Sequence, residues 1–233
     1  WAFAPAEAAE LVARGIRQLD EVAPPAPLQL QLQLLGLSIH PGMRRHRIPD
    51  LEAELLRLVG LARDAGLSAE VYRGLQIIAY VHLLAGDSGG ARERALHAQA
   101  AGRGADPATV VRALGDAARC LGIIERDMPR AQRFAEEADR LADGTGYDGH
   151  ELPQALGYVH HHNGMLDRAR AAFEHAARRA HREHERWFEC ISLSRIVMIE
   201  LERRDRIEIT IEPDLSTLPE MEELNKMQRG TSS

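Results

Sequence analysis

Residues 156–176, with the sequence LGYVHHHNGMLDRARAAFEHA, decide the fold of this chain. Two groups of residues there share a helix face. The first is Leu156, Gly157 and His160, and the second is Ala169, Phe173 and Ala176, which recur at intervals of four and three. This spacing is that of the buried face of an α-helix, which completes a turn about every 3.6 residues. Gly164 falls between the groups, where a residue without a side chain most easily ends a helix. The stretch therefore predicts two antiparallel helices that pack closely across a glycine-containing turn.

The same positions resemble a tetratricopeptide repeat. In that family a Leu-Gly pair, a large residue, a turn glycine and an Ala, aromatic, Ala series follow at these offsets. His160 stands where the family usually has an aromatic residue, and the Trp that often opens the motif is missing. The resemblance implies an all-α fold: a right-handed superhelical solenoid of antiparallel helix pairs.

Two further copies of the pattern precede this one. The alanines near the start of each second helix, Ala91, Ala131 and Ala169, lie 40 and 38 residues apart, more than the family's usual period of about 34. Gly86 and Gly164 supply two of the three turns, whereas in the middle pair Arg119 stands where a small residue is expected. The clearest repeats are predicted at residues 68–103, 107–143 and 150–182, inside a helical-repeat domain of residues 1–206.

Further helices are expected on both sides of these repeats. Apolar periodicity predicts them over residues 6–19, 28–39, 50–65 and 185–204. Asp50 is the expected cap of the third, and the last is expected to end at the Arg204-Asp205 pair. The composition then becomes acidic, and residues 207–233 are interpreted as a C-terminal tail that caps the end of the solenoid.

Composition argues against several classes of function. Aromatic residues make up only 4% of the chain and strand-like runs are scarce, which favours an all-α class. With a formal net charge of −6 and no basic stripe, direct contact with nucleic acid is disfavoured. The most apolar run, residues 74–86, is too short to cross a bilayer, so no membrane partner is expected.

Residue usage also suggests an origin and a compartment. Of 29 basic residues only Lys226 is a lysine, which we interpret as the codon bias of a GC-rich bacterial genome. Cys120 and Cys190 lie in apolar helical patterns and predict reduced core thiols of a cytoplasmic protein. The chain begins at Trp1 instead of Met, which suggests a segment of a longer polypeptide.

Two motifs that resemble reactive sites are better explained by structure. Residues 86–90, Gly-Asp-Ser-Gly-Gly, match the string around the nucleophile of chymotrypsin-like proteases. They fall on a turn between helices, where Asp or Ser caps a helix, and no triad is identified. The histidines at 160–162 point in three directions from a helix. His181 and His184 are one turn apart and could supply two ligands, but no His-Glu-x-x-His string occurs and no carboxylate partner is forced. Neither catalysis, a metal site nor a cofactor is therefore expected.

A surface carries the more informative prediction. In tetratricopeptide repeats the first helices line the concave face, and positions after the Leu-Gly pair point into the groove. Transferring these positions along the three repeats predicts an apolar groove with a polar edge. Its residues are Tyr80, Leu83, Leu84, Cys120, Ile123, Ile124, Glu151, Gln154, Tyr158, His161 and His162. Such a groove suits an amphipathic helix or an extended peptide, although its apolar residues are equally expected if they form interhelix core.

The resemblance implies a non-enzymatic protein–protein interaction module. The Ala- and Arg-rich style is similar to the helical-repeat regions of multidomain bacterial signalling and transcription regulators. In such a protein, a partner protein or peptide in the groove would bias a neighbouring domain. Two alternatives stay open. One is a domain that senses a small-molecule or peptide effector, which an enclosed apolar cavity with convergent polar groups would favour. The other is a scaffold that forms homo-oligomers through the apolar ends of the array.

Overall fold

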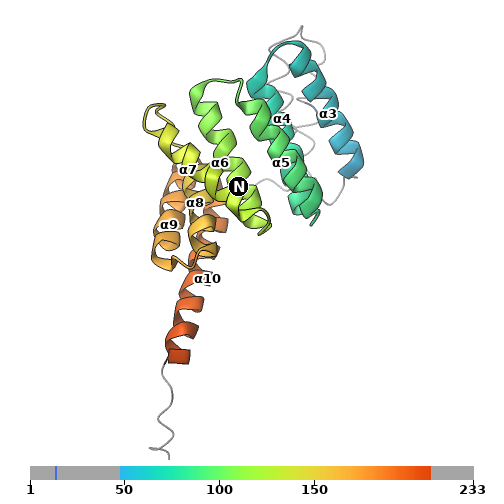
Figure 1. The fold of residues 1–233 in the computed structure, drawn as a ribbon. Coiled ribbons are helices and arrows are strands. Elements are labelled where there is room, and N and C mark those ends of the chain that lie inside the picture. Colours follow the sequence, from blue (N-terminus) through green and yellow to red (C-terminus); the bar gives the residue numbers. More distant parts are fainter. Residues whose placement is uncertain (1–13, 15–47, 211–233) are drawn as a thin grey trace, which may run out of the picture.

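A computed structural model of the chain describes Arg14 and residues 48–210. Within these residues the protein is all-helical, without strands, which confirms the predicted all-α class. The eight helices of residues 48–210 are α3 (Ile48–Asp64), α4 (Ser68–Leu84), α5 (Ser88–Gly102), α6 (Pro107–Ile123), α7 (Met128–Ala142), α8 (Glu151–His162), α9 (Leu166–Arg182) and α10 (Arg186–Thr210), as Figure 1 shows. Apart from Arg14, the helices predicted over residues 6–19 and 28–39 lie outside the described residues, and so do residues 211–233.

Each predicted repeat contains two consecutive helices: α4 and α5, α6 and α7, or α8 and α9. Two boundaries outside the repeats were predicted wrongly. α3 begins at Ile48, so Asp50 lies inside the helix instead of capping it. α10 continues past Arg204-Asp205 to Thr210. That pair contains no glycine or proline, and the next such residue is Pro213, so nothing in the backbone stops the helix earlier.

Short turns fold consecutive helices back on each other. Gly86 and Gly164 have φ angles of 77° and 71°, a left-handed conformation that glycine adopts without strain. The turn after α6 contains no glycine and instead places Glu125 at a φ of 52°. At the start of α5, the Asp87 side chain accepts a hydrogen bond from the Gly90 backbone N–H at 2.9 Å, as an N-cap does. The Gly-Asp-Ser-Gly-Gly string is thus part of a capped turn.

The core is a row of apolar clusters between neighbouring helices. Every helix from α3 to α9 contacts the next in sequence, and α6 also contacts both α4 and α8. Fully buried small residues line the second helices: Ala91, Ala95, Ala131, Ala135, Ala169 and Ala176. At Gly157, a Cβ would lie 2.9 Å from the Phe173 ring. The Leu-Gly pair therefore permits α8 and α9 to approach closely.

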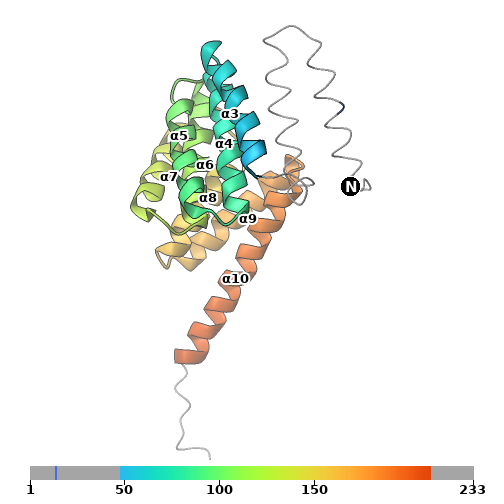
Figure 2. The ribbon, with the colours of Figure 1, turned by 90° about the vertical axis from the view of Figure 1, so that its right-hand side faces the viewer.

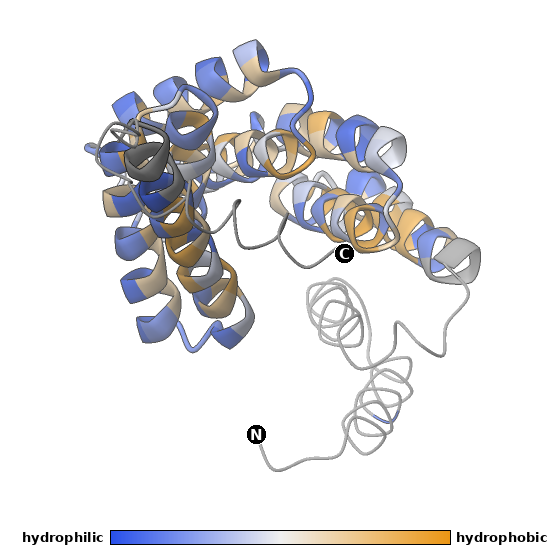
Figure 3. Cartoon of the chain, turned by 90° about the horizontal axis from the view of Figure 1, so that it is seen from below, coloured by the Kyte–Doolittle hydropathy of each residue, from blue (hydrophilic) through white to orange (hydrophobic). Residues whose placement is uncertain are grey.

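The molecule is elongated, with α3 to α5 at one end and α8 to α10 at the other (Figure 1). The C-terminal half of α10 extends beyond the other helices in two perpendicular views (Figures 1 and 2). Apolar residues gather on the sides of helices that face their neighbours, whereas polar residues cover the outer sides (Figure 3). α10 departs from this pattern, because Leu193, Val197 and Leu201 are 49%, 58% and 51% exposed.

Candidate binding site

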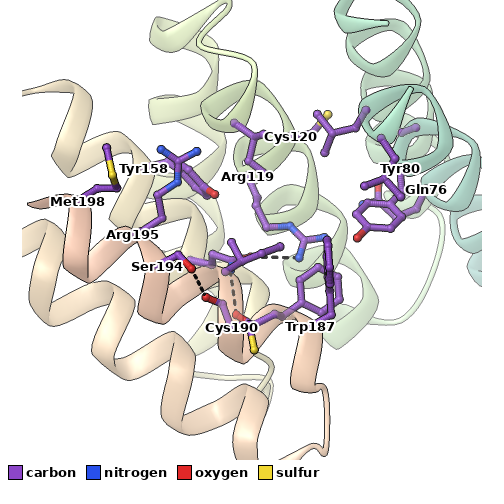
Figure 4. Close-up of a pocket in the computed structure, with 17 residues that line it drawn as sticks. Gln76, Tyr80, Arg119, Cys120, Tyr158, Trp187, Cys190, Ser194, Arg195 and Met198 are labelled. Carbon is purple, nitrogen blue, oxygen red and sulfur yellow. Dashed lines mark hydrogen bonds between the residues drawn. The ribbon is translucent and has the colours of Figure 1, made fainter. Parts of the chain in front are cut away.

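A cavity of about 670 Å³ lies between α4, α6, α8 and α10 (Figure 4). Seven of the eleven predicted groove residues line it: Tyr80, Leu83, Leu84, Cys120, Ile123, Gln154 and Tyr158. α10 supplies seven further lining residues, among them Trp187, Phe188, Arg195 and Met198. Alternate helices of the chain, far apart in sequence, thus present one mostly apolar surface.

The other four predicted groove residues lie elsewhere. Ile124 caps the C-terminal end of α6. Glu151 pairs with Arg112, with 3.2 Å between its Oε1 and the arginine Nε. His161 Nε2 lies 2.8 Å from a Glu202 carboxylate oxygen on α10, and His162 is exposed. The predicted groove residues one turn beyond Tyr158 therefore contact α10 or solvent. At the end of α8, the groove positions expected from the repeat pattern do not line the cavity.

Arg119 is the charged group at the centre of the cavity wall. Its Nη2 donates a hydrogen bond to Asp116 Oδ1 at 2.6 Å, and its Nη1 donates one to Gln154 Oε1 at 3.2 Å. The guanidinium also lies 4.5 Å from the centre of the Phe188 ring, within the range of a cation–π contact. Burial raises the pKa of Asp116 above its usual value, against the opposing effect of Arg119. Arg119 is therefore a fixed, paired part of the wall.

This role of Arg119 was not predicted, because Arg119 stands where the middle repeat was expected to have a small residue. The signal was nonetheless present: Asp116 and Arg119 are one helical turn apart inside an otherwise apolar stretch. Charged residues are seldom buried unless they are paired. An acid and a base at this spacing in an apolar segment therefore indicate an internal ion pair.

Two sets of contacts hold α10 against the earlier helices. Gln154 Nε2 donates a hydrogen bond to Ser192 Oγ at 3.0 Å, which joins α8 to α10. The His150 ring stacks on Phe188 with 4.6 Å between ring centres, and its Nδ1 lies 2.6 Å from a Glu183 carboxylate oxygen. α10 is therefore a wall of the cavity, held by these contacts together with the packing of its buried apolar residues against α8 and α9.

Tyr158 and Arg195 form another part of the wall. Tyr158 lines the cavity and is only 5% exposed. Its ring meets Phe173 edge to face at 5.1 Å, and the Arg195 guanidinium lies 4.9 Å from its centre. The Leu-Gly pattern placed Tyr158 on the correct face but did not show that α9 and α10 would cover the ring.

The cysteines differ from each other. Cys120 is buried, as predicted, and its Sγ donates a hydrogen bond to the Ala91 carbonyl oxygen at 3.7 Å. Burial raises the pKa of Cys120 to about 12, so the thiol stays protonated and is a poor nucleophile near neutral pH. Cys190 is exposed on α10, so its prediction as a core thiol was wrong. It lines the cavity from α10.

The described residues contain no group of three or more His, Cys, Asp or Glu side chains placed to hold a metal ion. Of the histidines considered earlier, His160 is half-buried, and His181 Nδ1 lies 2.9 Å from Glu189 Oε1. Between residues 48 and 210, every helix is too short or too polar to span a bilayer. Comparison of the chain with models of known protein families, and with curated proteins, finds no match. Fold and site define an all-α protein with a cavity between alternate helices.

Proposed function

We propose that this chain is a non-enzymatic binding module, a right-handed solenoid of antiparallel helix pairs similar to tetratricopeptide repeats. α4, α6, α8 and α10 are the first helices of successive pairs in this proposal. One observation carries it: the cavity of about 670 Å³ is lined by these four alternate helices. The protonated Cys120 thiol and the paired Arg119 side chain suit binding better than catalysis.

A small-molecule effector suits the cavity better than a peptide does. Sites for small molecules are concave, mostly apolar and about 300 to 1,000 Å³ in volume, with a few convergent polar groups. Arg119 and Arg195 supply such groups from two different helices. Since α10 forms one side of the cavity, an occupant would change the free energy of its docking. A neighbouring domain of a larger regulatory protein would respond to that change.

A second candidate, association with another protein, is favoured by the uncovered side of α10. Leu193, Val197 and Leu201 recur at intervals of four residues and are about half exposed. A continuous exposed apolar stripe often marks an interaction surface. A partner segment or a second copy of the chain would cover it in the manner expected for the end of a helical array. A cytoplasmic, bacterial regulatory protein remains our proposal for the parent polypeptide, and it rests on the arginine-rich composition.

A neutral apolar dye tests the proposed site. We expect N-phenyl-1-naphthylamine to bind saturably, with a rise in its fluorescence. Ser194 lines the cavity from an exposed position on α10, so Ser194→Phe should fill the space without disturbing the core and reduce dye affinity at least about tenfold, or 1.4 kcal/mol.

The matched control is Val197→Phe, because Val197 lies on the same helix, is 58% exposed and is not among the residues that line the cavity. Equal dye binding by both variants and the parent protein would place the dye outside the cavity and count against the proposed function.

A further inference from the structure

We infer that the cavity selects an apolar molecule that carries a carboxylate, and that Arg195 is the group that binds this carboxylate. The inference rests on the proposed function of the cavity and adds the chemical class of its ligand. It follows from the charge of the lining, from the way Arg195 is held and from the apolar surface around it.

The lining of the cavity is positively charged. It contains two arginines, Arg119 and Arg195, and no aspartate or glutamate. Asp116, behind the wall, lies 2.6 Å from Arg119 and balances its charge. Among the described residues no carboxylate lies within ion-pair distance of Arg195, and its guanidinium instead lies over the Tyr158 ring. Arg195 is therefore the cavity cation whose charge is left for a ligand.

Arg195 is also held in a suitable position. Its guanidinium lies over the Tyr158 ring at 4.9 Å, and Tyr158 is in turn fixed against the fully buried Phe173. A guanidinium that lies over an aromatic ring still has free N–H groups, and these can bind a carboxylate through two parallel hydrogen bonds. Ligand binding should cost the Arg195 side chain little conformational entropy, because the Tyr158 ring already restrains it.

The rest of the lining specifies an apolar body for the ligand. Leu83, Ile123, Trp187 and Met198 line the cavity with aliphatic and aromatic surface. Gln76 and Tyr80 lie on the opposite side of the view from Arg195 (Figure 4). An apolar ligand with a carboxylate at one end matches Arg195 and the apolar surface that lines the rest of the cavity.

The test compares 2-naphthylacetate with its neutral counterpart 2-(2-naphthyl)ethanol, each titrated into the whole chain by isothermal calorimetry and in competition with N-phenyl-1-naphthylamine. The acid should bind at least about tenfold more tightly than the alcohol. Arg195→Met should abolish that difference while leaving the affinity for the alcohol unchanged. The control is Arg133→Met, because Arg133 is exposed on α7 and does not line the cavity; it should keep the full difference.

Each other outcome overturns a defined part of the argument. Equal binding of acid and alcohol by the parent protein overturns the inferred ligand class but leaves the cavity as a binding site. Binding of neither compound, together with no binding of the neutral dye, overturns both the inference and the proposed function. A preference for the acid that persists in folded Arg195→Met shows that Arg195 is not the carboxylate-binding residue. Because the acid–alcohol comparison is made first on the parent protein, it holds even where a variant fails to fold.

Discussion

Phe173 and Tyr158 show how single residues determine this packing. Phe173 is fully buried and Tyr158 is 5% exposed, with 5.1 Å between their ring centres. Phe173→Ala should cost about 3 to 5 kcal/mol, and Tyr158→Ala a similar amount, because each leaves a cavity in the core. Urea denaturation monitored by circular dichroism measures both. The double variant should cost less than the sum, since the two rings share an interface; strict additivity would mean that they do not pack together.

The buried Asp116–Arg119 pair makes a second prediction for single residues. Asp116→Ala leaves the Arg119 charge, 6% exposed, without its carboxylate, and breaking such a pair usually costs about 3 to 5 kcal/mol. Replacing both residues with apolar ones, as in Asp116→Leu with Arg119→Met, should cost less than Asp116→Ala alone, because no buried charge is then left unpaired. Urea denaturation of the two variants compares them directly. A cost below about 1 kcal/mol for Asp116→Ala would indicate that water reaches the guanidinium.

The Asp106 carboxylate makes the stability of the start of α6 depend on pH. Its carboxylate caps α6 by accepting hydrogen bonds from Thr109 Oγ1 at 2.6 Å and Thr109 N at 3.0 Å, and these bonds lower its pKa below 3.8. Because the folded-state pKa is the lower one, the stabilisation is present above pH 3.8 and is lost as the pH falls through the folded value. Asp106→Ala should cost about 1 kcal/mol at neutral pH.

Asp106→Asn separates the cap from the charge, because asparagine also caps helices but does not titrate. Thermal denaturation between pH 2 and 7 should show a smaller acid-induced loss of stability in this variant than in the parent protein. An unchanged pH profile would mean that the carboxylate does not contribute through its ionised form.

The three helix pairs and α10 show what the sequence can and cannot predict. The pairs within residues 68–103, 107–143 and 150–182 follow from local signals: apolar period, turn glycines and caps act within a few residues. The contribution of α10 to the cavity depends on contacts such as Gln154 with Ser192, 38 residues apart, which no local pattern encodes. For the same reason the sequence placed Tyr158 on the correct face but did not show that other helices cover its ring, and it did not predict Arg195 at all.

Across the whole molecule, the apolar clusters lie in a row between neighbouring helices, which implies that each helix is stabilised mainly by the helices beside it. If the chain is a solenoid, each helix depends mainly on its neighbours and a perturbation at one end leaves the other end unchanged. Gln154 is fully buried and bonds both Arg119 and Ser192, so Gln154→Leu should release α10 first. Hydrogen exchange should then accelerate across α10 while α3 and α4 keep their protection.

Gln132→Leu is the control, since Gln132 is exposed on α7 and bonds only its helix neighbour Glu136 at 2.8 Å among the described residues; it should leave exchange in α10 unchanged. Faster exchange spread evenly from α3 to α10 in Gln154→Leu would show one cooperative unit and contradict the solenoid. Loss of protection in α10 alone would have a functional meaning as well. It would show that the helix carrying Arg195 can undock separately, as is required if ligand binding in the cavity is to control its position.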